Sequence, residues 1–403
     1  MSPENVRSPW RTLWLSPRQT IEQIVATRPK HLVLVLAVLG TIASFYGQIA
    51  SLGGTAYLAD WRLALGFVLL SAVIGIVWLY LSALILKWIG LLLGGQAPAL
   101  HLRAVIAWST WPTILSFLVV LLAGVSSIGT VLARQGAIAL LVAIFALWSL
   151  IVFLLMLARV EHFGFWRTIA TYLLNLIVAL AIAVFIRTLL FHPFNVPSNA
   201  MVPTLLSGDY FFAAKFPYGY SRFSLPFSPP LFSGRIFSSE PERGDVVVFT
   251  LPKDTSTIYV KRVVGLPGDR IQMKDGLLYI NDAPVKQERL ADYPGTEPCG
   301  LQADAAVKRW RETLPNGRSY ETLDCFDHGF YDNTNVFTVP AGHVFLLGDN
   351  RDNSTDSRAL SQVGYVPLEN LVGRSDLIFF SRNPGEAGAA RGVRTERVGR
   401  VVR

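Results

Sequence analysis

Cysteine and charge are both scarce in this 403-residue sequence. Only 16% of the residues are charged and 52% are hydrophobic, a composition that excludes an ordinary soluble protein. The two cysteines, Cys299 and Cys325, exclude a disulfide-rich scaffold; they either form one disulfide in an oxidising compartment or stay as two free buried thiols. The six histidines are scattered and no HExxH motif occurs, so we expect no metal and no cofactor.

Acidic residues are nearly absent from the first half of the chain. Residues 1–191 hold 12 Lys and Arg against 4 Asp and Glu, whereas residues 192–403 hold 24 of each. The net charge of +8 therefore belongs to the first half, where membrane topology explains it, and we expect no nucleic-acid binding. The N-terminus also lacks the pattern of a cleavable signal peptide.

Five long apolar segments fill most of the first half. They lie at 31–51, 64–86, 104–125, 136–158 and 168–191, and each is about long enough to cross a bilayer. Lys and Arg gather before the first segment and in the loops at 87–103 and 159–167, and these residues favour the cytoplasmic side of a membrane. The pattern predicts five α-helical spans, a cytoplasmic N-terminus and a second half outside the cytoplasm.

The second half has the pattern of a mainly β, antiparallel domain. Short runs rich in β-branched and aromatic residues recur between Gly, Pro and Asp. The predicted strands are Tyr210–Lys215, Asp245–Leu251, Ile258–Val264, Arg270–Lys274, Leu277–Ile280, Val344–Leu347 and Leu371–Phe380. The aromatic, Pro-rich stretch 216–234 predicts a surface loop that contacts lipid or, alternatively, a loop that covers the core.

A stiff stretch, residues 195–209, follows the last apolar segment directly. Pro197 and Pro203 remove two amide donors, and the residues between them are small or flexible. The run Pro-Ser-Asn-Ala-Met-Val-Pro-Thr-Leu resembles the nucleophile box of bacterial type I signal peptidases, P-S-x-S-M-x-P-T-L. In this resemblance, Ala200 stands where the family has its nucleophilic serine.

Three further boxes resemble the same family, in the family's order. Residues 244–249 are similar to one of its strand motifs, 259–269 to the box that holds its general-base lysine, and 348–358 to its closing box. Residues 312–320 resemble its smaller inserted β-domain. The resemblance implies a Ser/Lys peptidase of the bacterial inner membrane, with a periplasmic β-domain, that removes signal peptides from secretory preproteins.

The resemblance also implies a role for individual residues. Lys261 is the general base, and its apolar neighbours suit the neutral form that a base requires. Ser198 and the backbone N–H of residue 200 form the oxyanion hole. Ser354 orients the lysine amine. The supporting charged residues are Arg262, Asp349, Asp356 and Arg358.

Ala200 removes the atom that would attack the peptide bond, so we expect the chain as written to be inactive. Thr204 and Ser207 are hydroxyls near it in sequence, but both fill family positions that are not catalytic. Two origins stay open. One is a nucleophile substitution in an otherwise active peptidase, which the intact Lys261 and Ser354 favour. The other is a natural pseudopeptidase that binds signal peptides or organises the membrane without cleavage.

The expected organisation has four parts. Residues 1–165 form a multispanning membrane domain, which resembles the Yip family around Ser16–Thr20 or is an unrelated anchor. Residues 166–191 anchor the peptidase, and 192–385 form its catalytic domain with an inserted β-subdomain at 277–340. Residues 386–403 predict a basic disordered tail that contacts anionic lipid. The expected partners are preproteins and membrane lipid; the sequence indicates no oligomeric state.

Overall fold

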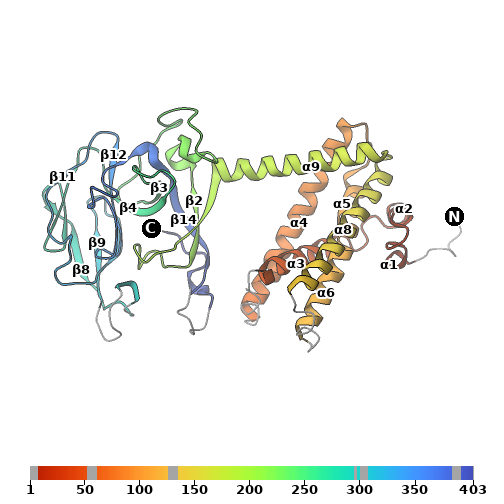
Figure 1. Cartoon of the computed structure of the whole chain (residues 1–403), viewed down its shortest axis with the longest axis horizontal. Helices are drawn as coiled ribbons and strands as arrows, with labels where there is room; N and C mark the ends of the chain where they lie inside the picture. Colours follow the sequence, from red (N-terminus) through yellow and green to blue (C-terminus); the bar gives the residue numbers. More distant parts are fainter. Residues whose placement is uncertain are drawn as a thin grey trace. The chain divides into compact units, whose positions relative to one another are not determined.

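The chain forms two compact units, Met1–Ile182 and Ala183–Arg403 (Figure 1). The computed structural model describes residues 8–51, 61–125, 135–294, 297–299, 307–383 and 392–402. Within these ranges the first unit is helical and the second is built mainly from strands, as the sequence predicts. The boundary between the units lies inside one helix, α9.

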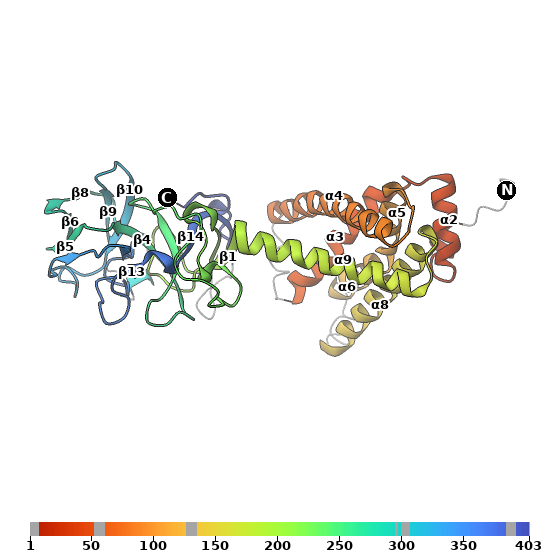
Figure 2. The ribbon, with the colours of Figure 1, turned by 90° about the horizontal axis from the view of Figure 1, so that it is seen from above.

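Long apolar helices make up most of the first unit (Figure 2). The helices are α1 (Pro9–Thr12), α2 (Pro17–Thr27), α3 (Val33–Ser51), α4 (Trp61–Leu92), α5 (Ala99–Ser109), α6 (Trp111–Val125), α8 (Gln135–Val160) and α9 (Phe165–Phe185). In the described part of the chain, four stretches are long and apolar enough to cross a membrane: Trp61–Leu92, Ala99–Leu121, Ala139–Val160 and Phe165–Leu190. The apolar stretch of α3, Val33–Gln48, is shorter, so a fifth crossing and the orientation of the chain remain predictions.

Tryptophans form the centre of the helical core. The Trp108 side chain is fully buried, and its ring centroid lies 4.8 Å from that of Trp10, which in turn lies 4.6 Å from that of Trp111. Such aromatic pairs contribute about 0.5–1.5 kcal/mol beyond the area that they bury. Close packing also depends on Gly40 in α3, because a Cβ there would lie only 2.9 Å from the Cβ of Thr110.

Antiparallel strands build the second unit. They form a seven-stranded sheet in the order β1-β2-β14-β3-β4-β12-β13, a four-stranded sheet β11-β5-β6-β7 and a three-stranded sheet β10-β9-β8. The strands are β1 (Phe191–Asn195), β2 (Asp209–Ala214), β3 (Val246–Thr250), β4 (Ile258–Gly265), β5 (Arg270–Lys274), β6 (Leu277–Ile280), β7 (Ala283–Pro284), β8 (Lys286–Arg289), β9 (Lys308–Thr313), β10 (Ser319–Asp324), β11 (Phe337–Thr338), β12 (His343–Leu347), β13 (Val366–Pro367) and β14 (Leu371–Ser381). All seven predicted strands are present, each within one residue of its predicted ends.

The centre of the large sheet is covered on both faces. All five residues of β3 are buried, and β3 pairs with β14 on one side and β4 on the other. A strand that is buried on both faces needs apolar residues throughout, which is why Val246–Thr250 has no polar alternation. Each fully buried Val or Phe contributes about 1.5–3 kcal/mol. This rigid centre fixes β4, the strand that carries Lys261.

Some residues of the stretch 216–234 are buried and others are exposed. Tyr218 and Phe223 are buried and pack into the cores of the second unit. Phe227 is fully exposed, and Leu231 is largely exposed. Part of the loop therefore covers the core, and part presents apolar side chains at the surface.

The C-terminal segment departs from the expectation of a disordered tail. Residues 392–402 run beside β14, where Val401 pairs with Leu377 and Val393 with Arg382. Arg397 is buried, although composition predicts a solvated arginine there. An arginine-rich segment is solvated only where no buried acid lies within bonding distance of its arginines. Here the fold places a buried carboxylate beside Arg397. The parts of the expected tail at 386–391 and at 403 lie outside the described residues.

Candidate active site

Three segments of the second unit carry the residues that the sequence singled out. Strand β4 carries Lys261 and Arg262, residues 196–208 follow β1, and residues 348–358 follow β12. β4 and β12 are neighbours in the sheet, with Arg262 opposite Leu347, so the closing loop starts beside β4. A bond from the Asn350 N–H to the Ala200 carbonyl (3.1 Å) joins the two loops.

Lys261 is a buried lysine with no hydrogen-bond partner among the described residues. Its side chain is 4% exposed, and its Nζ lies 5.2 Å from the centre of the Tyr259 ring. Burial lowers its pKa from 10.5 to about 8, and Arg358 acts in the same direction, whereas Asp356 and Asp349 oppose the shift. A lysine with this pKa is partly neutral near physiological pH, as a general base must be.

Ser354 lies against the backbone of residue 200. A Cβ on Gly348 would clash with the Ser354 side chain and would lie 2.7 Å from the Ala200 carbonyl oxygen. Glycine at 348 therefore lets Ser354 and residue 200 approach the same point. The Ser354 hydroxyl is buried and has no hydrogen-bond partner among the residues that the structure describes. A buried polar group left without a partner costs about 1–3 kcal/mol, so it marks a place where another polar group fits.

Two hydrogen-bond donors of the residue 200 loop are free in the described structure. Ser198 is exposed and its hydroxyl makes no hydrogen bond there. The backbone N–H of Ala200 likewise donates to no group of the described residues. The turn around it is held by bonds from the Val202 N–H to the Asn199 carbonyl (3.2 Å) and from the Leu205 N–H to the Met201 carbonyl (2.9 Å). Free donors on a fixed turn can bind an oxyanion.

Arg262 and Asp349 form a buried ion pair directly beside Lys261. The guanidinium donates from Nε to Asp349 Oδ1 (2.7 Å) and from Nη2 to Oδ2 (2.6 Å), and both side chains are 1% exposed. Thr204 joins them, because its hydroxyl donates to Asp349 (2.5 Å) and accepts from Arg262 (3.1 Å). Thr204 is thus held by this pair, which argues against its replacing the missing nucleophile.

Asp356 and Arg358 form a second buried pair in the closing loop. Arg358 donates to both oxygens of Asp356, at 2.9 and 2.8 Å, and the Gly348 N–H donates to Asp356 at 3.0 Å. Burial alone raises the pKa of Asp356, but these bonds and the charges of Arg358 and Lys261 outweigh it, so the pKa lies below its ordinary value. The carboxylate therefore stays charged and fixes the loop at Gly348.

Cys299 and Cys325 are joined by a disulfide, with their Cα atoms 5.7 Å apart. The bond lies next to the closing loop. The Cys325 N–H donates to the Asp352 carboxylate (2.7 Å), and Asn350 Nδ2 donates to the carbonyl of Pro298 (2.9 Å). The disulfide therefore ties the 297–299 turn to the loop that carries the supporting charges.

Sequence reasoning missed a third set of buried polar residues. Arg351 donates to Glu312 (2.5 Å), and the Tyr320 hydroxyl donates to the same carboxylate (2.8 Å). The Tyr320 ring also stacks on the Arg262 guanidinium, whose Cζ lies 4.0 Å from the ring centre. Glu312 of β9 and Tyr320 of β10 stand opposite each other and lie on the same face of their sheet. Only the fold shows that this face meets Arg262.

The second half of the chain matches a known family. The profile of signal peptidase, peptidase S26, matches residues 169–380. Signal peptidase I of Rickettsia typhi is 45% identical over 210 residues, which cover 50% of this chain and 76% of the relative. The enzyme of Rickettsia akari is 46% identical over 210 residues, with the same coverage.

The helical half matches a different family, and one solved structure is also similar. The Yip1 domain profile matches residues 10–187. The crystal structure of a signal peptidase I from Enterococcus faecalis V583 is 26% identical, covers 34% of this chain and 97% of its own, and gives a TM-score of 0.21. Because the S26 match spans more than half of the sequence, with relatives at 45% identity, the chain belongs to the signal peptidase family, and its helical half is similar to the Yip1 domain.

Proposed function

We propose that this fold is a membrane-bound peptidase that removes signal peptides from secretory preproteins by a Ser/Lys mechanism, and that Ala200 leaves this copy able to bind but unable to cut. One observation supports the proposal most. A lysine that is 4% exposed, with its pKa lowered to about 8 and no hydrogen-bond partner in the described structure, interacts electrostatically with Asp356, the carboxylate that holds Gly348 against residue 200. A structural lysine would be expected to have a carboxylate or carbonyl partner.

With a serine restored at position 200, the proposed chemistry needs only this chain's residues and water. The neutral amine of Lys261 takes the proton of a serine hydroxyl at 200, and the serine oxygen attacks the scissile carbonyl carbon. Ser198 and the backbone N–H of residue 200 stabilise the oxyanion, with each donor contributing about 2.7–4 kcal/mol. The lysine then protonates the leaving amine, and a water that it deprotonates hydrolyses the acyl-enzyme.

The two buried ion pairs hold this arrangement in place without touching the reacting atoms. Asp349 and Arg262 fix Thr204 and the strand of Lys261, and Asp356 fixes Gly348 beside Ser354. The unpartnered Ser354 hydroxyl then faces a place for the lysine amine or for a serine hydroxyl at 200. Effective positioning of a nucleophile and its base supplies much of an enzyme's rate enhancement.

A preprotein would bind in extended form. Strand β1 is an edge of the seven-stranded sheet and leads directly into the loop of residue 200, so a peptide strand can pair near it. Family resemblance implies small residues at the −1 and −3 positions of the substrate. The membrane spans would hold the site near the bilayer, with the second unit in the periplasm and the N-terminus in the cytoplasm of a bacterial inner membrane.

Ala200 itself favours a second candidate function, that of a pseudopeptidase which binds signal peptides or organises the membrane without cleavage. The test is to compare the unmodified chain with Ala200→Ser for cleavage and for retention of a preprotein with an intact signal peptide. Cleavage by Ala200→Ser alone supports the peptidase. Retention without cleavage in both chains supports the pseudopeptidase. Cleavage by the unmodified chain contradicts the assigned nucleophile; Ser207→Ala then tests the nearest remaining hydroxyl.

A further inference from the structure

A fully buried carboxylate, Asp209, closes the loop that carries residue 200. It stands at the start of β2, and its Oδ2 accepts a bond from the Leu206 N–H (2.8 Å). Its other bonds come from distant parts of the chain. Arg397 donates from Nε to both oxygens at 3.0 and 3.1 Å and from Nη2 to Oδ2 at 2.5 Å, and the Ser381 hydroxyl donates at 2.6 Å. The mechanism above uses none of these residues.

Two arginines of the C-terminal segment bind the same loop at three points. Besides Asp209, Arg397 holds the carbonyl of Thr204 at 2.9 Å. Arg394 donates to the carbonyl of Ser207 at 2.5 Å and to the Ser381 hydroxyl at 2.8 Å. The planar fork of an arginine fixes the direction as well as the distance of such bonds. Residues 392–402 therefore act as a clasp on the outer end of the loop.

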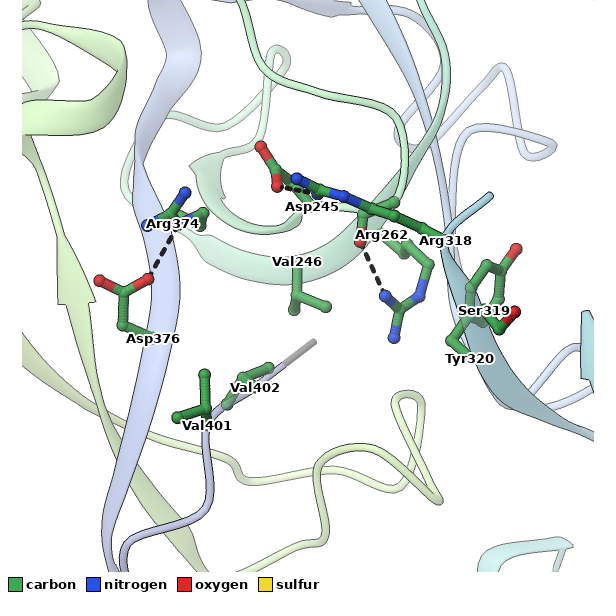
Figure 3. A pocket seen from close by; sticks show the side chains of 11 residues that line it. Asp245, Val246, Arg262, Arg318, Ser319, Tyr320, Arg374, Asp376, Val401 and Val402 are labelled. Atoms are coloured by element: carbon green, nitrogen blue, oxygen red, sulfur yellow. Dashed lines mark hydrogen bonds and ion pairs between the residues drawn. The ribbon is translucent and has the colours of Figure 1, made fainter. Parts of the chain in front are cut away.

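The clasp connects to the site through hydrogen bonds of Thr204. The Thr204 carbonyl accepts from Arg397, and its hydroxyl donates to Asp349, the partner of Arg262. The end of the clasp also lines the same cavity as Arg262. In Figure 3, Val401 and Val402 line a cavity of about 550 Å³ together with Arg262. A shift of the clasp would thus reach both the loop and the buried ion pair beside Lys261.

We propose that the C-terminal segment 392–402 positions the nucleophile loop, with Arg397 as the principal positioning residue. The segment is not a solvated tail, because Arg397 is 6% exposed and Val402 is 9% exposed. The expected effect on cleavage rests on the proposed function, whereas the clasp itself concerns only how the loop is held. Its two consequences, for catalysis and for loop order, are therefore tested separately.

The catalytic consequence is tested in the Ala200→Ser background with Arg397→Met, which removes the guanidinium but keeps an aliphatic stem. The matched control is Arg400→Met, because Arg400 is exposed and, among the described residues, its side chain bonds only to the Glu396 carbonyl. We expect the single-turnover rate with enzyme in excess to fall about 10- to 100-fold in the first variant. KM and the pH midpoint should stay unchanged, because Lys261 is not altered. This rate does not depend on the amount of folded enzyme, so a loss of stability alone would not lower it.

The structural consequence is tested in the unmodified chain, which needs no activity. Hydrogen–deuterium exchange of the peptide spanning 196–209 should speed up in Arg397→Met. Exchange of the same peptide in Arg400→Met, and of the β4 peptide 258–264 in both variants, should not change. Equal exchange of 196–209 in both variants overturns the clasp, whatever the cleavage assay shows. Faster exchange with an unchanged single-turnover rate overturns its positioning role. If Ala200→Ser does not cleave, the proposed function fails, and the exchange result alone decides the clasp.

Discussion

Restoring a serine at position 200 would make the cleavage rate a direct readout of the charge on Lys261. The structure buries this amine and lowers its pKa to about 8, chiefly by desolvation. Only the neutral amine can accept the serine proton, so the rate of the acylation step should follow the neutral fraction. The perturbation is Ala200→Ser, and the variable is pH.

The expected size of the effect follows from the lowered pKa. With a pKa near 8, the neutral fraction rises from about 9% at pH 7 to about 91% at pH 9, so the rate should rise about tenfold and then level off. A solvated lysine near 10.4 would rise about 100-fold over the same range, with no plateau. Folding stability changes with pH in the same direction as the rate, so the protein must be shown to stay folded at each pH. Because the folded pKa lies below the unfolded one, this group costs stability in full below pH 8, and the cost falls as the pH rises towards 10.4.

The assay is single-turnover cleavage of a preprotein by the detergent-solubilised Ala200→Ser protein between pH 6 and 10, with circular dichroism recorded at each pH. Ser354→Ala is the informative comparison, because its buried hydroxyl has no partner in the described structure and lies beside residue 200. If this hydroxyl binds the amine, the variant moves the midpoint as well as lowering the rate. A rate that keeps rising to pH 10, or one that ignores pH, would refute the base role of Lys261.

Three further predictions follow from the same geometry. In the serine-restored protein, Lys261→Arg should abolish turnover and leave the circular dichroism spectrum unchanged, because arginine stays charged; substantial residual activity would contradict the mechanism. Asp349→Ala should lower the free energy of unfolding by about 3–5 kcal/mol, because it removes the carboxylate that the buried Arg262 guanidinium pairs with, whereas Asp282→Ala at an exposed pair should cost less than about 1 kcal/mol; equal denaturation midpoints would argue against the buried pair. In intact cells, the two cysteines should resist alkylation until a reductant is added, and free thiols there would contradict an extracytoplasmic second unit.

Local patterns in the sequence predicted much of this molecule. Long apolar runs predicted helices, because 20 apolar residues span a bilayer only as a helix. Short β-branched runs between Gly, Pro and Asp predicted the seven strands to within one residue. The four boxes predicted the family and placed Lys261 and Ser354 in one site, since motif spacing carries information that composition does not. The structure does bring Ser354 to residue 200, across more than 150 positions of sequence.

Contacts between distant segments could not be predicted in this way. No sequence pattern indicated that Arg351 would meet Glu312, or that Tyr320 would stack on Arg262, because each pair joins strands or loops whose neighbours are set by sheet order. It also assigned Arg397 to a disordered tail, because an arginine-rich segment is solvated unless a buried acid meets it.

The sequence by itself determined which residues have the chemistry: a lysine in an apolar strand, serines in two boxes, and an alanine where a nucleophile is expected. Only the tertiary structure decided the environment in which these residues can react. Desolvation of Lys261 requires packing around β4, and the free N–H of residue 200 requires a turn held from both sides. The clasp exists only because β14 has an edge that residues 392–402 can pair with. A pKa and a loop position depend on what surrounds a residue in space, and local sequence does not specify those surroundings.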